Sequence, residues 1–180
     1  GGHGQLDLHN GTTMVVMVVL GEEDCQRLAG MPSVIYKDDR FWCYILPPIK
    51  YPDGTTRLKL GGNLLTKEGE LVGRIEKDPE GMVKWYRSGG DAGRKQELWE
   101  MVDTLVPGLR PLEVFVDACI TSNTPTGRPY LGEVSPGVFV AAGGNGQAAK
   151  SCDEIGRMAA AAALAPDGWG AGEKWGRELF

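Results

Sequence analysis

One segment near the C-terminal end of the sequence constrains the fold most. An apolar run, Val138–Ala142, is followed directly by the residues GGNGQAAKS at positions 143–151. The apolar run predicts a buried strand, and the glycines predict a tight turn before the first turn of a helix. A strand that leads into such a turn can direct backbone N–H groups and a helix N-terminus at an electron-rich ligand group. The segment therefore predicts a turn that faces a ligand.

The bulk composition is that of a globular protein and excludes several classes. The 180 residues, 42% of them hydrophobic and 24% charged, suffice for one sizeable core. A net charge of −5 without any run of Lys or Arg argues against a nucleic-acid surface. The longest apolar run, Met14–Leu20, is too short to cross a bilayer. We therefore expect no nucleic-acid partner and no transmembrane segment.

The cysteines and histidines do not have the spacing of a metal site. No two cysteines form a CxxC pair, and both histidines, His3 and His9, lie near the N-terminus. We therefore predict no metal site. Widely spaced cysteines in a chain with a proper core also favour free thiols and a reducing compartment such as the cytosol or an organelle matrix.

Apolar patterns predict a large antiparallel sheet. The run at residues 13–20 is apolar on both faces and predicts a central strand. A hairpin is predicted around residues 37–40, and a second one between about Trp42 and Leu60. Pro47-Pro48 are expected to end the strand they follow, and Gly61-Gly62-Asn63 to close the second hairpin.

Helices are predicted at a few places only. Glu22–Leu28 has acidic residues at its start, Lys95–Leu105 has apolar residues at helical spacing, and Cys152–Leu164 ends in a run of alanines. The pattern predicts an α+β fold with a large, mainly antiparallel sheet, a few helices and a C-terminal strand, glycine turn and helix.

The expected organisation has four parts. Residues 1–11 are a tail or a processing or cloning remnant, and residues 12–136 form the antiparallel domain. Residues 137–165 form the returning strand, the turn and the helix. Residues 166–180 form a C-terminal tail with two tryptophans.

Two segments resemble one known family. The residues CITSNTPTGRPYLGEVSPGVFVAAGGNGQAAKSCDEIGRMAA, from Cys119 to Ala160, resemble the C-terminal signature of the D-amino-acid oxidase and sarcosine oxidase (DAO) superfamily of FAD-dependent oxidoreductases. The residues YILPPIKYPDGTTRLKLGGN, from Tyr44 to Asn63, resemble the substrate-domain hairpin of that superfamily. The likeness extends over roughly residues 12–163.

The resemblance implies a cofactor and a role. In that superfamily a Rossmann-type half binds FAD, and a large antiparallel sheet covers the flavin and shapes the substrate pocket. This sequence resembles the sheet half and lacks the strand–GxGxxG–helix that holds the FAD pyrophosphate. The resemblance therefore implies that FAD binding depends on a partner, or another segment, that supplies the missing half. Without it, FAD binding would be weak or absent.

The resemblance also implies which residues contact the flavin. The turn, with backbone N–H groups from Gly144 to Gln147, would stabilise negative charge on the reduced flavin ring, and Lys150 falls where a flavin-contacting lysine is found. The alternative is an ordinary strand-to-helix turn with a solvated lysine. The expected cofactor-binding residues are Cys119, Gly143, Gly144, Asn145, Gly146, Gln147 and Lys150.

Three further side chains carry specific expectations. In sarcosine-oxidase-like members a cysteine at the position of Cys119 can hold the flavin as a thioether, which requires a thiolate that Arg128 or Lys150 could favour. The alternative is a buried cysteine that packs as a small hydrophobe. Arg128 suits a substrate carboxylate, and Tyr44 lies on the hairpin that would cover the pocket, with Arg57 or Lys59 opposite. Each is otherwise a surface or sheet-packing residue. No catalytic residue is indicated.

Two functions remain open. The chain is either the substrate-binding and flavin-capping part of an oxidoreductase that oxidises a C–N bond of an amino acid or secondary amine, or a non-catalytic accessory subunit of a larger assembly. The glycine turn and Cys119 favour the first, and the missing FAD-binding motif favours the second.

Overall fold

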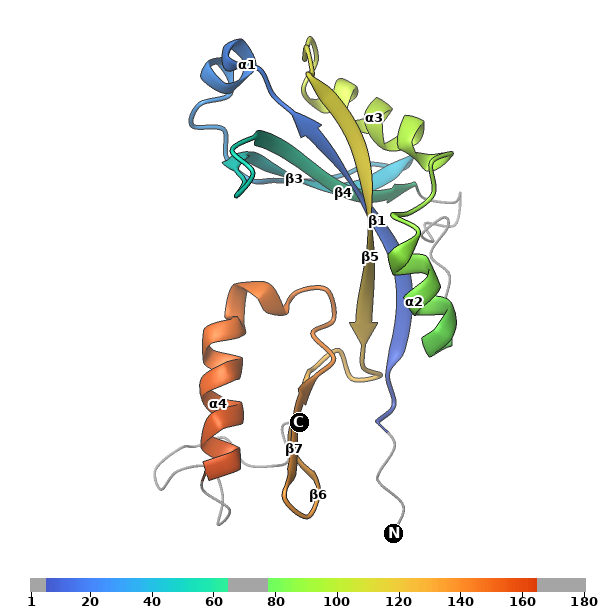
Figure 1. Cartoon of the computed structure of the whole chain (residues 1–180), viewed down its shortest axis with the longest axis vertical. Helices are drawn as coiled ribbons and strands as arrows, with labels where there is room; N and C mark the ends of the chain where they lie inside the picture. The colour runs from blue at the N-terminus through green and yellow to red at the C-terminus, as the bar shows by residue number, and fades with distance from the viewer. Residues whose placement is uncertain (1–5, 65–77, 165–180) are drawn as a thin grey trace. The chain divides into compact units, whose positions relative to one another are not determined.

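The computed structural model describes residues 6–64 and 78–164 and divides the chain into two compact units (Figure 1). One unit is Thr12–Ile120, here called the sheet unit. The other combines Gly1–Gly11 with Thr121–Phe180 and is called the turn unit, because it contains the glycine turn. The predicted C-terminal tail at residues 166–180 lies outside the described residues. Within the described ranges, no helix has the length and apolar character needed to cross a membrane.

The sheet unit is built on five strands in the order β2-β3-β4-β1-β5, and the pairs β1/β4, β2/β3 and β3/β4 are antiparallel. The mainly antiparallel α+β fold is thus confirmed. The prediction of a central strand is also confirmed, because β1 lies between β4 and β5 and is buried from Met14 to Val19. The strands are β1 His9–Val19, β2 Val34–Lys37, β3 Phe41–Lys50, β4 Thr56–Leu64 and β5 Glu113–Asn123.

The described part of this unit also contains the helices α1 Glu22–Arg27, α2 Pro79–Arg87 and α3 Arg94–Leu105. The helices predicted near Glu22 and Lys95 are therefore confirmed. Alternation along the strands directs one set of side chains towards α3, and each fully buried aliphatic side chain contributes about 1.5–3 kcal/mol. The core formed in this way contains Met14, Val16, Val18, Cys43, Ile45, Leu58, Leu60, Leu98, Met101 and Val102.

Two of the predicted strand ends are wrong. Pro47 and Pro48 do not end β3, which continues to Lys50 through a register shift between Leu46 and Ile49. A bulge leaves residues out of the hydrogen-bond ladder, so prolines are tolerated there. Gly61 and Gly62 do not close the hairpin either, because β4 continues to Leu64 and pairs both glycines with β3.

The turn unit contains a two-stranded antiparallel sheet, β6 Tyr130–Ser135 and β7 Val138–Ala142, and helix α4 Cys152–Leu164. The predicted bounds of α4 are confirmed. The predicted burial of β7 is wrong, since Val138 is 48% exposed and the other residues are half-buried or exposed. A two-stranded sheet gives β7 one neighbouring strand only, and no residue of β7 is fully enclosed.

Candidate functional site

The glycine turn is held in place by the side chain of Asn145. Asn145 has a φ of 53°, in the left-handed region that side chains rarely adopt. Its Oδ1 accepts the backbone N–H of Thr124 at 2.9 Å, and its Nδ2 donates to the carbonyl of Gly143 at 2.6 Å. Its backbone N–H donates to the carbonyl of Ser122 at 2.8 Å. Asn145 therefore ties the turn both to the end of β5 and to Thr124, the residue that follows this strand.

Thr124 completes this connection from the other side. It is 7% exposed, and its hydroxyl donates to the carbonyl of Arg128 at 2.7 Å. Gly143 has a φ of 77°, and a Cβ added there would lie 2.4 Å from Cγ2 of Thr124. The turn therefore packs against Thr124 so closely that only glycine fits at position 143.

Of the four backbone N–H groups from Gly144 to Gln147, two make no hydrogen bond within the described part of the chain. Those of Asn145 and Gln147 donate to the carbonyls of Ser122 and Gly144. Those of Gly144 and Gly146 donate to no acceptor in the described part of the chain. The turn thus retains two donors for an electron-rich group.

The residues after the turn differ from the predicted helix start. Ala148–Ser151 forms one short 3₁₀ turn, η1, and α4 begins only at Cys152. Lys150 is exposed, and its Nζ donates to Oε1 of Gln147 at 3.4 Å. The positive end of an α-helix therefore does not follow the glycines directly. Arg128 lies in the exposed loop between Thr124 and β6.

The sheet unit brings Tyr44, Lys59 and Cys119 to one face. Lys59 pairs with Leu46, two residues from Tyr44, so alternation places both side chains on the face opposite the core. The guanidinium of Arg57 lies 5.1 Å from the ring centre of Phe115, which places Cys119, four residues along β5, on this face as well. This surface also includes Trp42, and we call it the aromatic face.

Arg57 is already engaged on the aromatic face. It forms an ion pair with Asp53, and its guanidinium lies 4.5 Å from the ring centre of Tyr51. Lys59, in contrast, is half-buried and makes no ion pair or hydrogen bond with any described residue. Of the two cations expected opposite Tyr44, Lys59 is therefore the one available to a ligand.

Cys119 is half-buried in β5, and burial raises the pKa of its thiol above the ordinary value. The Lys59 ammonium lowers this pKa in part, whereas Asp117 raises it further. The cation near the thiol is thus Lys59 and belongs to the sheet unit. A raised pKa keeps the thiol protonated near neutral pH, which disfavours the thiolate needed for attachment to a flavin.

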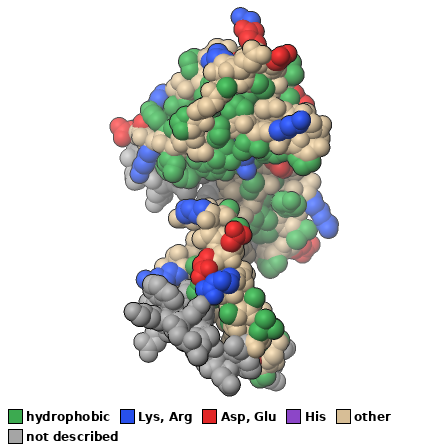
Figure 2. Space-filling view, turned by 90° about the vertical axis from the view of Figure 1, so that its left-hand side faces the viewer, with side chains coloured by type: hydrophobic (Ala, Val, Ile, Leu, Met, Phe, Trp, Pro, Cys, Tyr) green, Lys and Arg blue, Asp and Glu red, His purple; other side chains and the backbone are tan. Residues whose placement is uncertain are grey.

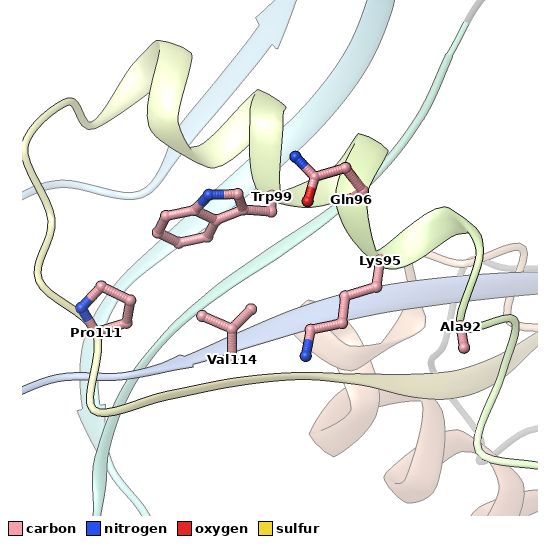
Figure 3. Close-up of a pocket in the computed structure, with 6 residues that line it drawn as sticks. All are labelled: Ala92, Lys95, Gln96, Trp99, Pro111 and Val114. Carbon is pink, nitrogen blue, oxygen red and sulfur yellow. The ribbon is translucent and has the colours of Figure 1, made fainter.

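A shallow groove lies on the opposite side of this unit, between α3 and β5 (Figure 3). Its lining consists of Ala92, Lys95, Gln96, Trp99, Pro111 and Val114. The close-up shows the ring of Trp99 with Gln96 next to it, and the side chain of Lys95 extending towards the strands on the side of Val114. The groove contains no pair of acid–base groups. Over residues 6–64 and 78–164, no three His, Cys, Asp or Glu side chains are grouped to hold a metal ion.

Sequence reasoning missed Thr124, Ser122 and Gly61 as residues that shape these surfaces. Thr124 is 21 residues from Asn145, and no local pattern links them. The sequence does hold one indication for Gly61, which is a glycine pair inside a segment where apolar and polar residues alternate on both sides of the pair. That pattern indicates close packing within a strand as well as a turn.

Comparisons with known proteins agree with this fold. Residues 5–162 match the family model for FAD-dependent oxidoreductases, DAO. The chain superposes on the fructosyl amine:oxygen oxidoreductase amadoriase I of Aspergillus fumigatus with a TM-score of 0.56, at 16% identity. Two double-cysteine variants of this amadoriase match with TM-scores of 0.55 and 0.56, at 16% and 15% identity. No curated protein matches the sequence significantly.

These matches cover most of this chain but a much smaller share of each amadoriase chain. The match includes 88% of this chain and 35% of the amadoriase chain, and for the two variants the values are 87% and 35%. This chain therefore spans about a third of the length of these neighbours. Because the family match extends over most of the sequence, the chain belongs to the DAO family of FAD-dependent oxidoreductases.

Proposed function

We propose that this chain is the substrate-binding and flavin-capping part of an FAD-dependent oxidoreductase that oxidises a C–N bond of an amino acid or a secondary amine. The FAD-binding Rossmann half comes from another polypeptide or from another segment of a longer protein. Bound FAD supplies the electron acceptor for this chemistry. The chain's own residues bind, orient and shield the reactants.

The observation that carries this proposal is that the N–H groups of Gly144 and Gly146 donate to no acceptor among the described residues. A flavin ring gains negative charge when it is reduced, and fixed backbone donors stabilise such charge without reorganisation. Asn145 holds the two donors in place through its bonds to Thr124 and Gly143. The residues of the turn therefore fit a flavin ring, and Lys150 adds a cation on the exposed side of the turn.

The aromatic face suits the substrate. The Lys59 ammonium can pair with a carboxylate, and the Tyr44 hydroxyl can donate a hydrogen bond beside it. Trp42 and Tyr44 form an edge-to-face pair with their ring centres 6.3 Å apart, which gives the surface an apolar wall. Arg128 is a second candidate for the carboxylate. Amadoriase I acts on fructosyl amines, as its name states, and a secondary amine is consistent with that class.

FAD is expected to bind without a covalent link. The raised pKa of Cys119 opposes its attack on the flavin ring, and a thioether at Cys119 is the alternative. The absorbance spectrum of the purified protein, before and after acid precipitation, distinguishes the two states. Flavin that stays in the supernatant supports reversible binding, and flavin that remains in the pellet of the wild type, but not of a Cys119→Ser variant, supports the thioether.

The same sample tests the proposal as a whole. Full-length protein that contains this chain should bind FAD and lose its flavin colour when an amine substrate is added without oxygen. A colourless protein that stays colourless with added FAD would favour a non-catalytic accessory subunit instead.

A further inference from the structure

Gly61 occupies the middle of a paired strand, where glycine normally weakens a sheet. It pairs with Tyr44 of β3 on one side and with Val15 of β1 on the other. Gly61 is not among the glycines with a positive φ, so its backbone conformation is open to any residue. The backbone therefore gives no reason for glycine at this position, and the reason must be space.

The space above Gly61 is filled by Tyr44. A Cβ added to Gly61 would lie 2.5 Å from both Cζ and Oη of Tyr44, and 2.6 Å from Cε1. Real Cβ atoms essentially never come so close to another heavy atom. The phenol end of the ring therefore lies over β4, directly above the glycine.

This orientation carries the hydroxyl away from β3 towards β1 and β5. Burial raises the pKa of Tyr44, and the nearby Cys119 and Tyr51 raise it further. Lys59 lies two residues from Gly61 along β4 and on the same face. The position of the ring thus brings the Tyr44 hydroxyl to the same part of the aromatic face as Lys59 and Cys119.

We propose that Gly61 is the positioning residue for Tyr44: because position 61 has no side chain, the ring lies across β4 and its hydroxyl reaches the centre of the aromatic face. This inference rests on the proposed function only in taking Tyr44 as a substrate contact. Any larger residue at position 61 forces the ring upright, away from β4, and changes the shape of the substrate surface.

A double-mutant cycle on the full chain tests the contact. Gly61→Ala, Tyr44→Ala and the double variant are compared by chemical denaturation with the wild type. Gly61→Ala should lower the unfolding midpoint when Tyr44 is present and leave it unchanged or raise it in the Tyr44→Ala background. If Gly61→Ala fails to fold alone but folds in the Tyr44→Ala background, the contact is equally supported. An equal loss in both backgrounds would overturn the proposal.

Two further measurements test the position of the hydroxyl rather than stability. In Gly61→Ala the phenol of Tyr44, isolated by subtracting the titration of a Tyr44→Phe variant, should ionise at lower pH than in the wild type. Cys119, followed by peptide mass spectrometry after treatment with a neutral thiol reagent, should react several-fold faster. An unchanged phenol titration together with unchanged labelling would overturn the positioning role.

These measurements do not require a flavin. If the protein binds no FAD but the cycle and the titration give the expected results, the proposed function fails while the role of Gly61 stands. If the protein binds FAD but Gly61→Ala leaves the phenol and the thiol unchanged, the role of Gly61 fails alone.

Discussion

The side-chain carbonyl of Asn145 accepts the backbone N–H of Thr124 at 2.9 Å and so joins the glycine turn to the segment that follows β5. The same side chain donates to the carbonyl of Gly143 at 2.6 Å. Because these bonds fix the turn, they also fix the directions of the N–H groups of Gly144 and Gly146. Asn145 thus supports the proposed flavin contact without having to touch the flavin itself.

Two substitutions at Asn145 should separate the contribution of its side-chain hydrogen bonds to the free energy of unfolding from that of its backbone conformation. Asn145→Ala loses the bonds to Thr124 and Gly143 and keeps a strained positive φ, so we expect a loss of about 1–3 kcal/mol in the free energy of unfolding. Asn145→Gly relieves the strain and should lose less. Chemical denaturation of both variants measures the difference, and equal losses would show that the conformation contributes nothing.

Gly143→Ala should be among the most damaging small substitutions in the turn unit. The added methyl group meets Cγ2 of Thr124 at 2.4 Å, and the φ of 77° is unfavourable for alanine. Gly156→Ala is the matched control, since position 156 lies within α4 with open space around it. That control should stabilise the protein by about 0.5–1 kcal/mol. If both substitutions have the same effect on the unfolding midpoint, the close packing against Thr124 is not present.

The hairpin between β2 and β3 should show a defined acid response. The N–H of Phe41, together with the N–H and guanidinium of Arg40, lowers the pKa of Asp38 from 3.8 to about 2. A carboxyl whose pKa is lowered on folding contributes stability above its unfolded pKa and loses it as the pH falls through its folded pKa. Wild-type protein should therefore lose this contribution between about pH 4 and pH 2.

An Asp38→Asn variant lacks this carboxyl and should lose less stability over the same pH range. Asp39→Asn is the control, because the carboxyl of Asp39 accepts no hydrogen bond from any described residue. Thermal unfolding at several pH values measures both. The effect will be modest, since solvent screens the ion pair between the half-buried Asp38 and the exposed Arg40. Parallel acid curves for wild type and Asp38→Asn would refute the assignment.

The ammonium of Lys59 should set the reactivity of Cys119. It opposes the rise in pKa that burial causes, so Lys59→Met should raise the pKa of the thiol further. A tenfold lower thiolate fraction corresponds to about 1.4 kcal/mol, and we expect a several-fold slower modification of Cys119 at neutral pH. The pH dependence of labelling, followed at Cys119 by mass spectrometry, checks this. Lys50→Met serves as the control, and an identical loss of rate there would point to a general effect of charge.

Local patterns predicted much of the fold because they are set by neighbouring residues. Alternation predicted β4, apolar residues at helical spacing predicted α3, and a segment that ends in a run of alanines predicted α4. Such patterns do not predict how residues far apart in the sequence pack against each other. The glycine pair at positions 61 and 62 predicts a turn, whereas Gly61 lies within β4 and leaves space for the Tyr44 ring above it. The hydrogen bond between Thr124 and Asn145 joins residues 21 positions apart, and no pattern in the sequence predicts it.

Burial of β7 was overestimated for a related reason. An apolar strand predicts burial, but the neighbours that bury it are supplied by tertiary structure. Figure 2 shows hydrophobic side chains spread over the surface of the sheet unit that faces the viewer, with Lys, Arg, Asp and Glu mostly at its margin. Among the described residues, Ile35 and Leu112 are apolar and strongly exposed, at 76% and 73%.

The visible absorbance spectrum of the natural protein that contains this chain tests the central claim most directly. We predict the bands of a bound flavin, and we predict that they bleach when an amine substrate is added in the absence of oxygen. A protein without these bands, which also acquires none when FAD is supplied, would contradict the proposal that this chain covers a flavin.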